Sequence, residues 1–154
     1  MRKCILAAFL FIFSLSAYPS HCKEIFPLGT ITEDQAREMI DKLDSNEGVP
    51  GIYTLQKAGY KGRFLVLPND TEYRPKARYI SVILSSTNSN DSVGRVKFFL
   101  TPTSEKNTYD AEYYDYGDLA VVKKTFTANT LQDQIIIDPY PLHRVKNQFI
   151  KVYP

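Results

Sequence analysis

The sequence predicts an all-β fold of about eight short antiparallel strands, with one helix near the N-terminus. Three observations predict it. Short runs of branched and aromatic residues recur from residue 51 onward, with turn-forming residues between them. Only residues 32–43 have the apolar spacing of an amphipathic helix. No alternation of strands and helices follows, which disfavours a parallel sheet and favours an antiparallel barrel or sandwich.

Residues 1–22 have the composition of a signal peptide. A basic start is followed by an apolar run at residues 4–15 and then by small residues. The run is shorter than the roughly 20 residues that a membrane-spanning helix needs. Cleavage is predicted after Ala17 or after Cys22, and the residues before Cys22 do not match a lipoprotein signal. We therefore expect an exported protein, periplasmic or secreted, with no membrane association after cleavage.

The charge of the chain argues against a nucleic-acid partner. The chain has 19 basic and 17 acidic residues, and two of the basic ones, Arg2 and Lys3, lie in the predicted signal peptide. Without them the basic and acidic residues are equal in number. A nucleic-acid-binding domain is expected to carry a basic surface, which a neutral chain does not favour.

Residues 23–50 are predicted to form an extended leader and the helix. Thr32 is a good N-cap residue, and Gln35 completes a capping box. One apolar stripe follows, formed by Ala36, Met39, Ile40 and Leu43. The helix should end before Gly48, and it needs a β structure to cover.

Residues 51–154 are predicted to form the β domain. Strands are expected at residues 52–55, 64–67, 79–84, 96–100, 109–116, 119–127, 131–138 and 149–153. The predicted turns include Ala58 to Gly62 and Gly117-Asp118, and Asn129 is expected to break the sixth strand. Residues 80–84 and 96–100 are apolar on both faces, so the helix or a partner should cover their second face.

Several short stretches carry a resemblance to a known family. They are Gly51-Ile52-Tyr53 after the helix, Ile83-Leu84-Ser85-Ser86, Gly94-Arg95-Val96-Lys97-Phe98-Phe99-Leu100, Tyr113-Tyr114 and Phe149-Ile150-Lys151-Val152-Tyr153-Pro154. Together they resemble the small lipocalin-like β-barrel module of bacterial exported proteins, which is often found ahead of a C-terminal-processing type serine peptidase domain. The resemblance implies a lipocalin-like antiparallel barrel and export. No peptidase domain follows Pro154, so it carries over no catalytic residue.

We expect the protein to be a non-catalytic binding protein whose barrel holds an apolar or aromatic ligand. The candidate ligand-binding residues are Tyr53, Phe64, Tyr79, Phe98, Tyr113 and Tyr114. Core packing is the alternative role for all six. The alternative function is an interaction protein that binds or inhibits an exported enzyme, such as a peptidase or a glycan hydrolase. In that case the polar loop from Ser85 to Gly94 would be the contact.

An enzyme is the least favoured class. Four carboxylates are interleaved with tyrosines in one predicted strand and its turn, namely Asp110, Glu112, Asp115 and Asp118. They would suit a calcium site, a sugar site or a glycosidase pair, although the outward face of a strand explains them as well. His143 lies in a predicted loop, and no G-x-S-x-G motif supplies a serine for it. We expect no catalysis, no metal and no cofactor. Asn69 and Asn90 match glycosylation sequons.

Overall fold

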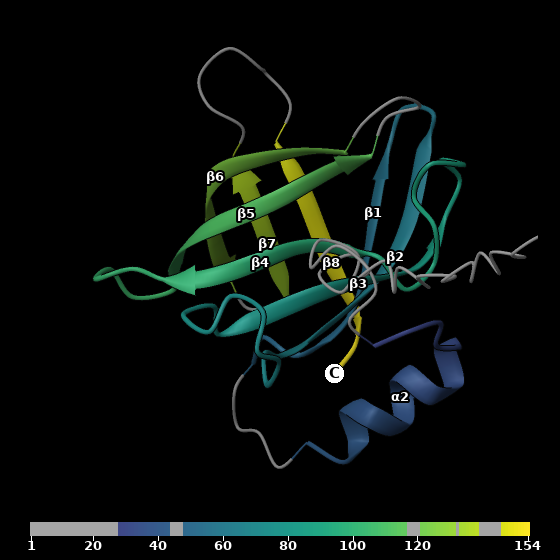
Figure 1. Cartoon of the computed structure of the whole chain (residues 1–154), viewed down its shortest axis with the longest axis horizontal. Helices are drawn as coiled ribbons and strands as arrows, with labels where there is room; N and C mark the ends of the chain where they lie inside the picture. Colours follow the sequence, from purple (N-terminus) through teal and green to yellow (C-terminus); the bar gives the residue numbers. More distant parts are fainter. Residues whose placement is uncertain (1–27, 44–47, 117–120, 132, 139–145) are drawn as a thin grey trace, which may run out of the picture.

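Eight antiparallel strands follow one another in chain order around a closed barrel (Figure 1). The computed structural model describes residues 28–43, 48–116, 121–131, 133–138 and 146–154. The strands are β1 (Gly51–Lys57), β2 (Tyr60–Pro68), β3 (Tyr79–Ser86), β4 (Val96–Pro102), β5 (Thr108–Tyr116), β6 (Val121–Leu131), β7 (Gln134–Asp138) and β8 (Asn147–Tyr153). Pairing of β8 with β1 closes the sheet. The predicted antiparallel all-β fold is confirmed, and the structure is a barrel rather than a sandwich.

The single described helix, α2 (Glu33–Asp41), begins at the predicted capping box. Thr32 Oγ1 accepts a hydrogen bond from the Gln35 backbone N–H at 3.3 Å, and Gln35 Oε1 accepts one from the Thr32 N–H at 2.8 Å. Ala36 and Ile40, from the predicted apolar stripe, are buried. They belong to the same apolar core as Ile52 of β1.

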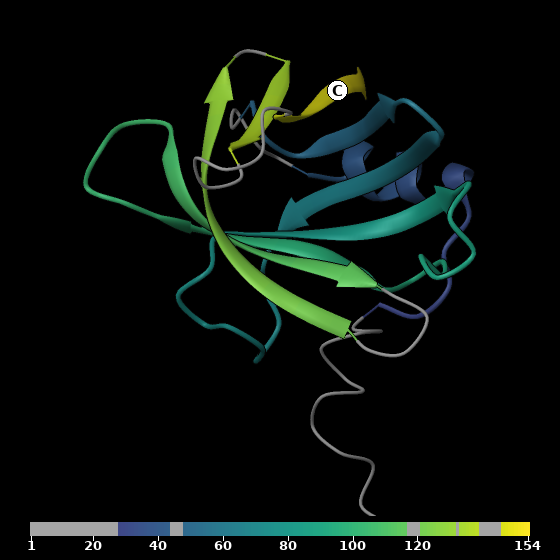
Figure 2. The ribbon, with the colours of Figure 1, turned by 90° about the horizontal axis from the view of Figure 1, so that it is seen from above.

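The helix lies against the outside of the barrel, beside its first and last strands (Figures 1 and 2). Glu33 near its start forms an ion pair with Arg63 of β2 at 2.9 Å. Near its end, the Tyr153 hydroxyl donates to Asp41 at 2.7 Å, and the Arg37 guanidinium lies 4.4 Å from the centre of the Tyr153 ring. These contacts hold the helix on the barrel wall at β1, β2 and β8, and not over β3 and β4, the strands whose second apolar face was expected to need a cover.

Several strand boundaries differ from prediction, two of them at predicted turns or breaks. Asn129 does not break the sixth strand, because it pairs with Thr108 of β5 and with Ile136 of β7. Its side-chain oxygen accepts a hydrogen bond from the Thr108 hydroxyl at 3.2 Å, so strand pairing leaves its polar group satisfied. The first hairpin is also tighter than predicted. Residues 60–62 belong to β2 and pair with β1, although they were expected to lie in the turn. The Gly117-Asp118 turn lies outside the described residues.

Contacts between strands that are not neighbours show which side chains fill the barrel. Phe149 of β8 lies 5.1 Å from Phe64 of β2 and 5.1 Å from Phe98 of β4, measured between ring centres. Tyr79 of β3 lies 5.8 Å from Tyr109 of β5. Because each pair spans at least one intervening strand, these rings meet across the interior. Aromatic rings therefore form much of the barrel core.

The barrel has two distinct ends, which follow from the strand directions. The β1–β2 hairpin tip and the β3–β4 loop, residues 87–95, lie at one end of the barrel. We call it the Lys97 end, after the buried lysine near the start of β4. The start of β1 at Gly51 and the start of β3 at Tyr79 lie at the opposite end. The candidate site lies at the Lys97 end.

Candidate functional site

The six predicted ligand-binding residues are all buried, but they do not form one group. Phe98 stacks with Tyr113 at 6.5 Å between ring centres, and Phe64 joins them through Phe149. These three predicted residues form the middle of the interior. They lie together as the prediction requires, in a set of rings that contact one another.

The other three predicted residues lie elsewhere. Tyr53 and Tyr79 are near the opposite end, where the Tyr53 hydroxyl donates to the Val49 carbonyl at 2.6 Å. Tyr114 follows Tyr113 in a regular strand and so occupies the other face of the sheet. There its ring stacks on Tyr116 at 6.5 Å. Tyr53 nevertheless pairs with Phe64 and so adjoins the middle rings, whereas the Tyr79 ring contacts that of Tyr109 and Tyr114 lies on the other face.

A lysine that the sequence prediction passed over lies inside the Lys97 end. Val96 pairs with Val82 and Phe98 pairs with Ser81, so Lys97 is an extra residue with no partner in β3. This is a β-bulge, which re-aims side chains and is common next to functional sites. As a result Lys97 and Phe98 are both buried although they are adjacent in the strand. Lys97 is only 3% exposed.

The partner of Lys97 is Asp91, which comes from the β3–β4 loop and is also buried. Lys97 Nζ lies 3.1 Å from one carboxylate oxygen of Asp91 and 3.3 Å from the other. The Tyr60 hydroxyl donates to the same carboxylate at 2.7 Å, and the Ser86 hydroxyl lies 3.3 Å from it. Donors from β2, β3 and β4 thus converge on one carboxylate. Together these four residues form the Lys97 cluster.

Tyrosine rings surround the ammonium group of Lys97. Its Nζ lies 5.0 Å from the centre of the Tyr113 ring, 5.6 Å from that of Tyr116 and 6.0 Å from that of Tyr60. These distances allow cation–π attraction, which is strongest where water is excluded. The Tyr116 hydroxyl also donates to the Val96 carbonyl beside the bulge. The cluster is therefore aromatic as well as charged.

Burial shifts the pKa values of this cluster. Desolvation lowers the pKa of the Lys97 ammonium group, and the Asp91 carboxylate opposes that shift. Desolvation raises the pKa of Tyr60, and its hydrogen bond to Asp91 raises it further. The pKa of Tyr113 is raised well above its ordinary value, mainly by desolvation. At neutral pH the tyrosines are therefore neutral hydrogen-bond donors.

Stability alone is a poor explanation for the Lys97 cluster. Removing two charges from water costs several kcal/mol per ion, on the order of what their attraction returns. Apolar residues of similar volume often serve a protein core as well or better. The neighbouring interior is made of such residues, including Phe64 and Phe149. A buried, tyrosine-lined ion pair at one end of a barrel is thus the strongest functional feature among the described residues.

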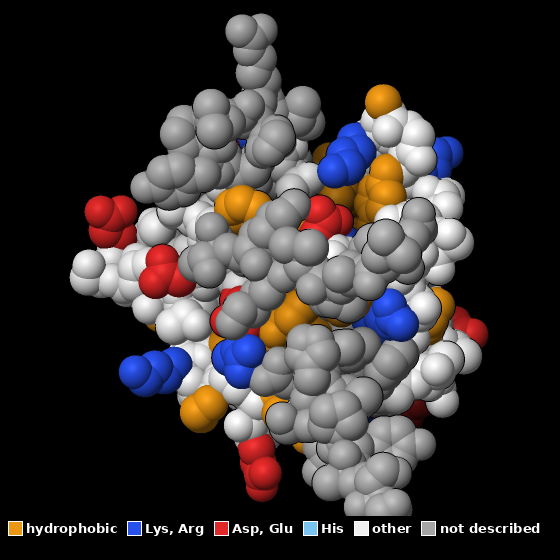
Figure 3. Space-filling model, turned by 45° about the horizontal axis from the view of Figure 1, so that its top comes forward, with side chains coloured by type: hydrophobic (Ala, Val, Ile, Leu, Met, Phe, Trp, Pro, Cys, Tyr) orange, Lys and Arg blue, Asp and Glu red, His pale blue; other side chains and the backbone are white. Residues whose placement is uncertain are grey.

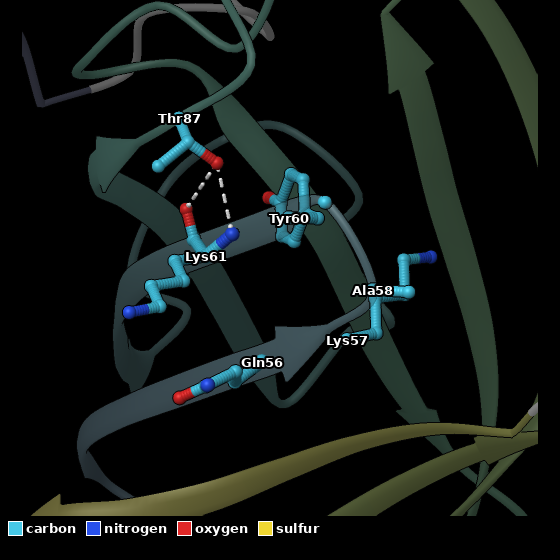
Figure 4. A pocket seen from close by; sticks show the side chains of 7 residues that line it. Gln56, Lys57, Ala58, Tyr60, Lys61 and Thr87 are labelled. Carbon is cyan, nitrogen blue, oxygen red and sulfur yellow. Dashed lines mark hydrogen bonds between the residues drawn. The ribbon is translucent and has the colours of Figure 1, made fainter.

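An open hollow of about 660 Å³ adjoins the cluster at the first hairpin (Figure 4). Tyr60 and the side chains of Lys57 and Lys61 line it. Thr87 fixes its rim, because its hydroxyl oxygen accepts a hydrogen bond from the Lys61 N–H at 2.9 Å. Tyr60 is shared: its ring lines the hollow and its hydroxyl binds the buried Asp91. Tyr60 therefore belongs both to the lining of the hollow and to the Lys97 cluster.

Gly62 makes room for this arrangement. A Cβ atom at this position would lie 2.8 Å from the Tyr60 hydroxyl oxygen and 2.6 Å from the Phe64 ring. Both distances are shorter than van der Waals contact allows. The glycine thus permits Tyr60 to reach inward over the middle rings.

The loop from Ser85 to Gly94, predicted as the contact for a protein partner, has two buried residues. Asp91 is buried as described, and Gly94 packs against the backbone of Gly29, ahead of α2. Other loop residues, such as Thr87 and Ser92, are exposed. The loop closes over the Lys97 end while presenting a polar outer surface.

The remaining candidate chemistry does not assemble in the described residues. Glu112 forms an ion pair with Arg74 at 2.6 Å and accepts a hydrogen bond from Tyr114 at 2.9 Å, while Asp110 is exposed. Asp118 and His143 lie outside the described residues. Within the described ranges, no group of three or more His, Cys, Asp or Glu side chains is placed to hold a metal ion. The described part of the chain also includes no helix of the length and apolarity needed to cross a membrane.

The surface seen in Figure 3 mixes basic and acidic side chains without one dominant region. This agrees with the near-neutral composition. Large apolar side chains are exposed at three positions of the described chain, Leu131, Ile150 and Val152. Leu131 pairs with Gln134, which pairs with Ile150, so these side chains share the outer face of β6–β8. We call them the β8 patch.

Sequence reasoning missed Lys97, Asp91 and Tyr60 for an identifiable reason. Lys97 interrupts an apolar run, Val96 to Leu100, and that interruption was the available signal. Its inward direction depends on the bulge, which sequence periodicity does not reveal. Asp91 was included only as part of the loop from Ser85 to Gly94, predicted as a protein contact. A scan against family models and searches of curated proteins and of solved structures found no match for this chain.

Proposed function

We propose that this protein is an exported, non-catalytic binding protein that takes a small apolar or aromatic ligand at the Lys97 end of its barrel. The composition of residues 1–22 supports export, periplasmic or secreted. The observation that carries the binding proposal is the buried Lys97–Asp91 pair within a ring of tyrosines. Binding sites are commonly apolar and aromatic, with a few placed polar groups that set orientation.

The geometry supports binding at this end in particular. Tyr60 connects the open hollow with the buried carboxylate, and the rings of Tyr113 and Phe98 lie directly beneath. A flat ligand could stack on these rings while a polar group reached the Lys97 cluster. The mouths of barrels are frequent sites for such ligands.

Native mass spectrometry of the protein released from its own host tests the proposal. We expect a co-purifying small molecule whose added mass disappears in a variant with Lys97→Met and Tyr60→Phe. A matched variant, Lys106→Met with Tyr73→Phe, should retain it, because both positions lie away from the cluster. A ligand-free protein that also binds nothing in a screen of apolar and aromatic compounds would contradict the proposal.

A second function is favoured by the β8 patch. The protein would then bind or inhibit an exported enzyme through Leu131, Ile150 and Val152, because exposed apolar side chains that gather on one face can mark interaction sites. Replacing Ile150 and Val152 by Thr should abolish capture of a protein partner and leave small-molecule binding unchanged. If these substitutions abolish small-molecule binding and leave capture of the protein partner unchanged, this alternative is excluded.

A further inference from the structure

The Lys97 cluster has the chemistry of a carboxylate-binding site. Its donors are one ammonium group and two hydroxyl groups, from three different strands, and all of them address the same carboxylate. The ammonium group is buried, and the bulge in β4 aims it inward. Such convergence of charged and neutral donors is the general way in which proteins bind carboxylates.

The carboxylate in this site belongs to a loop rather than to a strand. Asp91 is in the β3–β4 loop, and its backbone N–H donates to the Asn88 carbonyl at 3.0 Å. Ser92 after it is exposed and Asn90 before it is half-buried. The loop thus inserts one acidic side chain into a site whose three donors stand on the barrel wall.

We propose that Asp91 occupies the place of a ligand carboxylate, so that the ligand of this barrel is a small aromatic carboxylic acid. This inference rests on the proposed function and names its ligand class. The acid group replaces Asp91 on Lys97 and Tyr60, and the aromatic body stacks on the tyrosine rings around them. The lysines that line the adjoining hollow, Lys57 and Lys61, favour approach of an anion.

The arrangement makes Asp91 an internal competitor. A ligand carboxylate binds only when Asp91 has left, so the apparent dissociation constant is the intrinsic one divided by the fraction of molecules with the site open. Small acids without an aromatic body should compete poorly with a carboxylate that is tethered to the chain. An aromatic body supplies the extra contacts that displacement requires.

The test compares 2-naphthoate with its neutral isostere 2-naphthamide, using isothermal titration calorimetry on the purified exported protein. We expect the acid to bind at least about tenfold more tightly than the amide. Lys97→Met should remove this preference. Asp91→Asn, which keeps the side-chain shape but removes the charge, should tighten binding of the acid by about tenfold or more, because a neutral amide competes less well for Lys97. Lys106→Met and Asp110→Asn, both at exposed positions, are the charge-matched controls and should change neither value.

The outcomes separate the inference from the proposed function. Equal binding of acid and amide would overturn the carboxylate proposal and leave an aromatic-binding barrel. Weaker binding of the acid to Asp91→Asn would also overturn it, because Asp91 would then support the site instead of competing for it. If Asp91→Asn does not fold, the acid-over-amide preference of the natural chain and its loss in Lys97→Met decide the matter. Failure of every aromatic compound to bind would contradict the proposed function itself.

Discussion

Lys97 and Asp91 hold opposite charges in a part of the barrel where their side chains are 4% and 0% exposed. Removing one charge of such a pair leaves the other without compensation. Lys97→Met or Asp91→Leu should therefore lower the free energy of unfolding by about 3–5 kcal/mol. Replacing both residues together should recover most of that loss. Urea denaturation of the natural chain, the two single variants and the double variant measures the coupling free energy between the two residues.

A surface pair provides the control for this double-mutant cycle. Lys146 and Asp138 lie 2.8 Å apart, and both side chains are well exposed. Their cycle should give a coupling free energy of at most about 1 kcal/mol. An equally small coupling for the Lys97 pair would show that solvent reaches it and would remove the basis of the candidate site.

Asn69 has a structural role that competes with its sequon. Its side-chain nitrogen donates to the carbonyls of Tyr73, Arg74 and Ala77 at 3.0 to 3.2 Å, which holds the loop between β2 and β3. A glycan on this nitrogen would break these bonds. Asn69→Ala should lower the free energy of unfolding by about 1–3 kcal/mol, measured by thermal or urea denaturation. An unchanged stability would contradict this role.

At the residue scale, the sequence predicted which side chains are buried better than it predicted what they do. Phe64, Phe98 and Tyr113 are interior rings because large aromatic residues in alternating strand positions bury readily. Lys97 was missed because its direction depends on a bulge. Tyr114 was grouped with Tyr113 although strand alternation places adjacent residues on opposite faces.

At the scale of elements, α2 shows how local signals determine a helix. The capping box, the acidic first turn and the buried apolar stripe all agree, so the predicted start at Thr32 is confirmed. Thr32→Ala should lower the free energy of unfolding by about 1 kcal/mol because the cap is lost. Thr103→Ala, in the loop between β4 and β5, where its hydroxyl donates to the Thr108 carbonyl at 3.0 Å, is a suitable comparison. No change on Thr32→Ala would mean that barrel contacts alone hold the helix.

Strand positions were predictable because each apolar run lies between turn-forming residues, but strand lengths were not. Asn129 was expected to end the sixth strand, yet a paired neighbour on each side and a hydrogen bond from Thr108 keep it in β6. Bulges at Lys97 and between Arg63 and Phe64 were not expected either. These features are determined by pairing with distant strands, which local sequence does not encode.

At the scale of the whole molecule, the buried tyrosines determine how stability responds to alkali. Desolvation raises the pKa values of Tyr53, Tyr60, Tyr113 and Tyr116. In the unfolded chain tyrosines ionise near pH 10, so above that pH the unfolded state loses protons that the folded state keeps. The free energy of unfolding should therefore fall as pH rises beyond about 10. The lowered pKa values of Lys97 and Lys151 have the opposite effect just below that pH, but two lysines oppose four tyrosines.

Urea denaturation across the alkaline range measures this dependence, with phenolate absorbance as a second signal. Tyr113→Phe should reduce the slope, because one of the shifted groups is removed. Phenolate absorbance that rises fully before the barrel unfolds would show that these tyrosines titrate in the folded state, contrary to their burial.

Closure of the barrel was predictable only in part. Eight short strands in regular succession fit both a barrel and a sandwich, and the choice depends on β8 pairing with β1 across the length of the chain. That pairing brings Phe149 into contact with Phe64 and Phe98, and it leaves the Lys97 end as the polar end of an otherwise aromatic interior. The function proposed for the protein depends on this difference.

A two-dimensional ¹H–¹⁵N NMR titration of the purified protein with 2-naphthoate tests that function most directly. We expect saturable shifts of the amide signals of Tyr60, Asp91 and Lys97, which are absent in Lys97→Met. Shifts confined to the β8 patch, or no shifts with any aromatic compound, would contradict it.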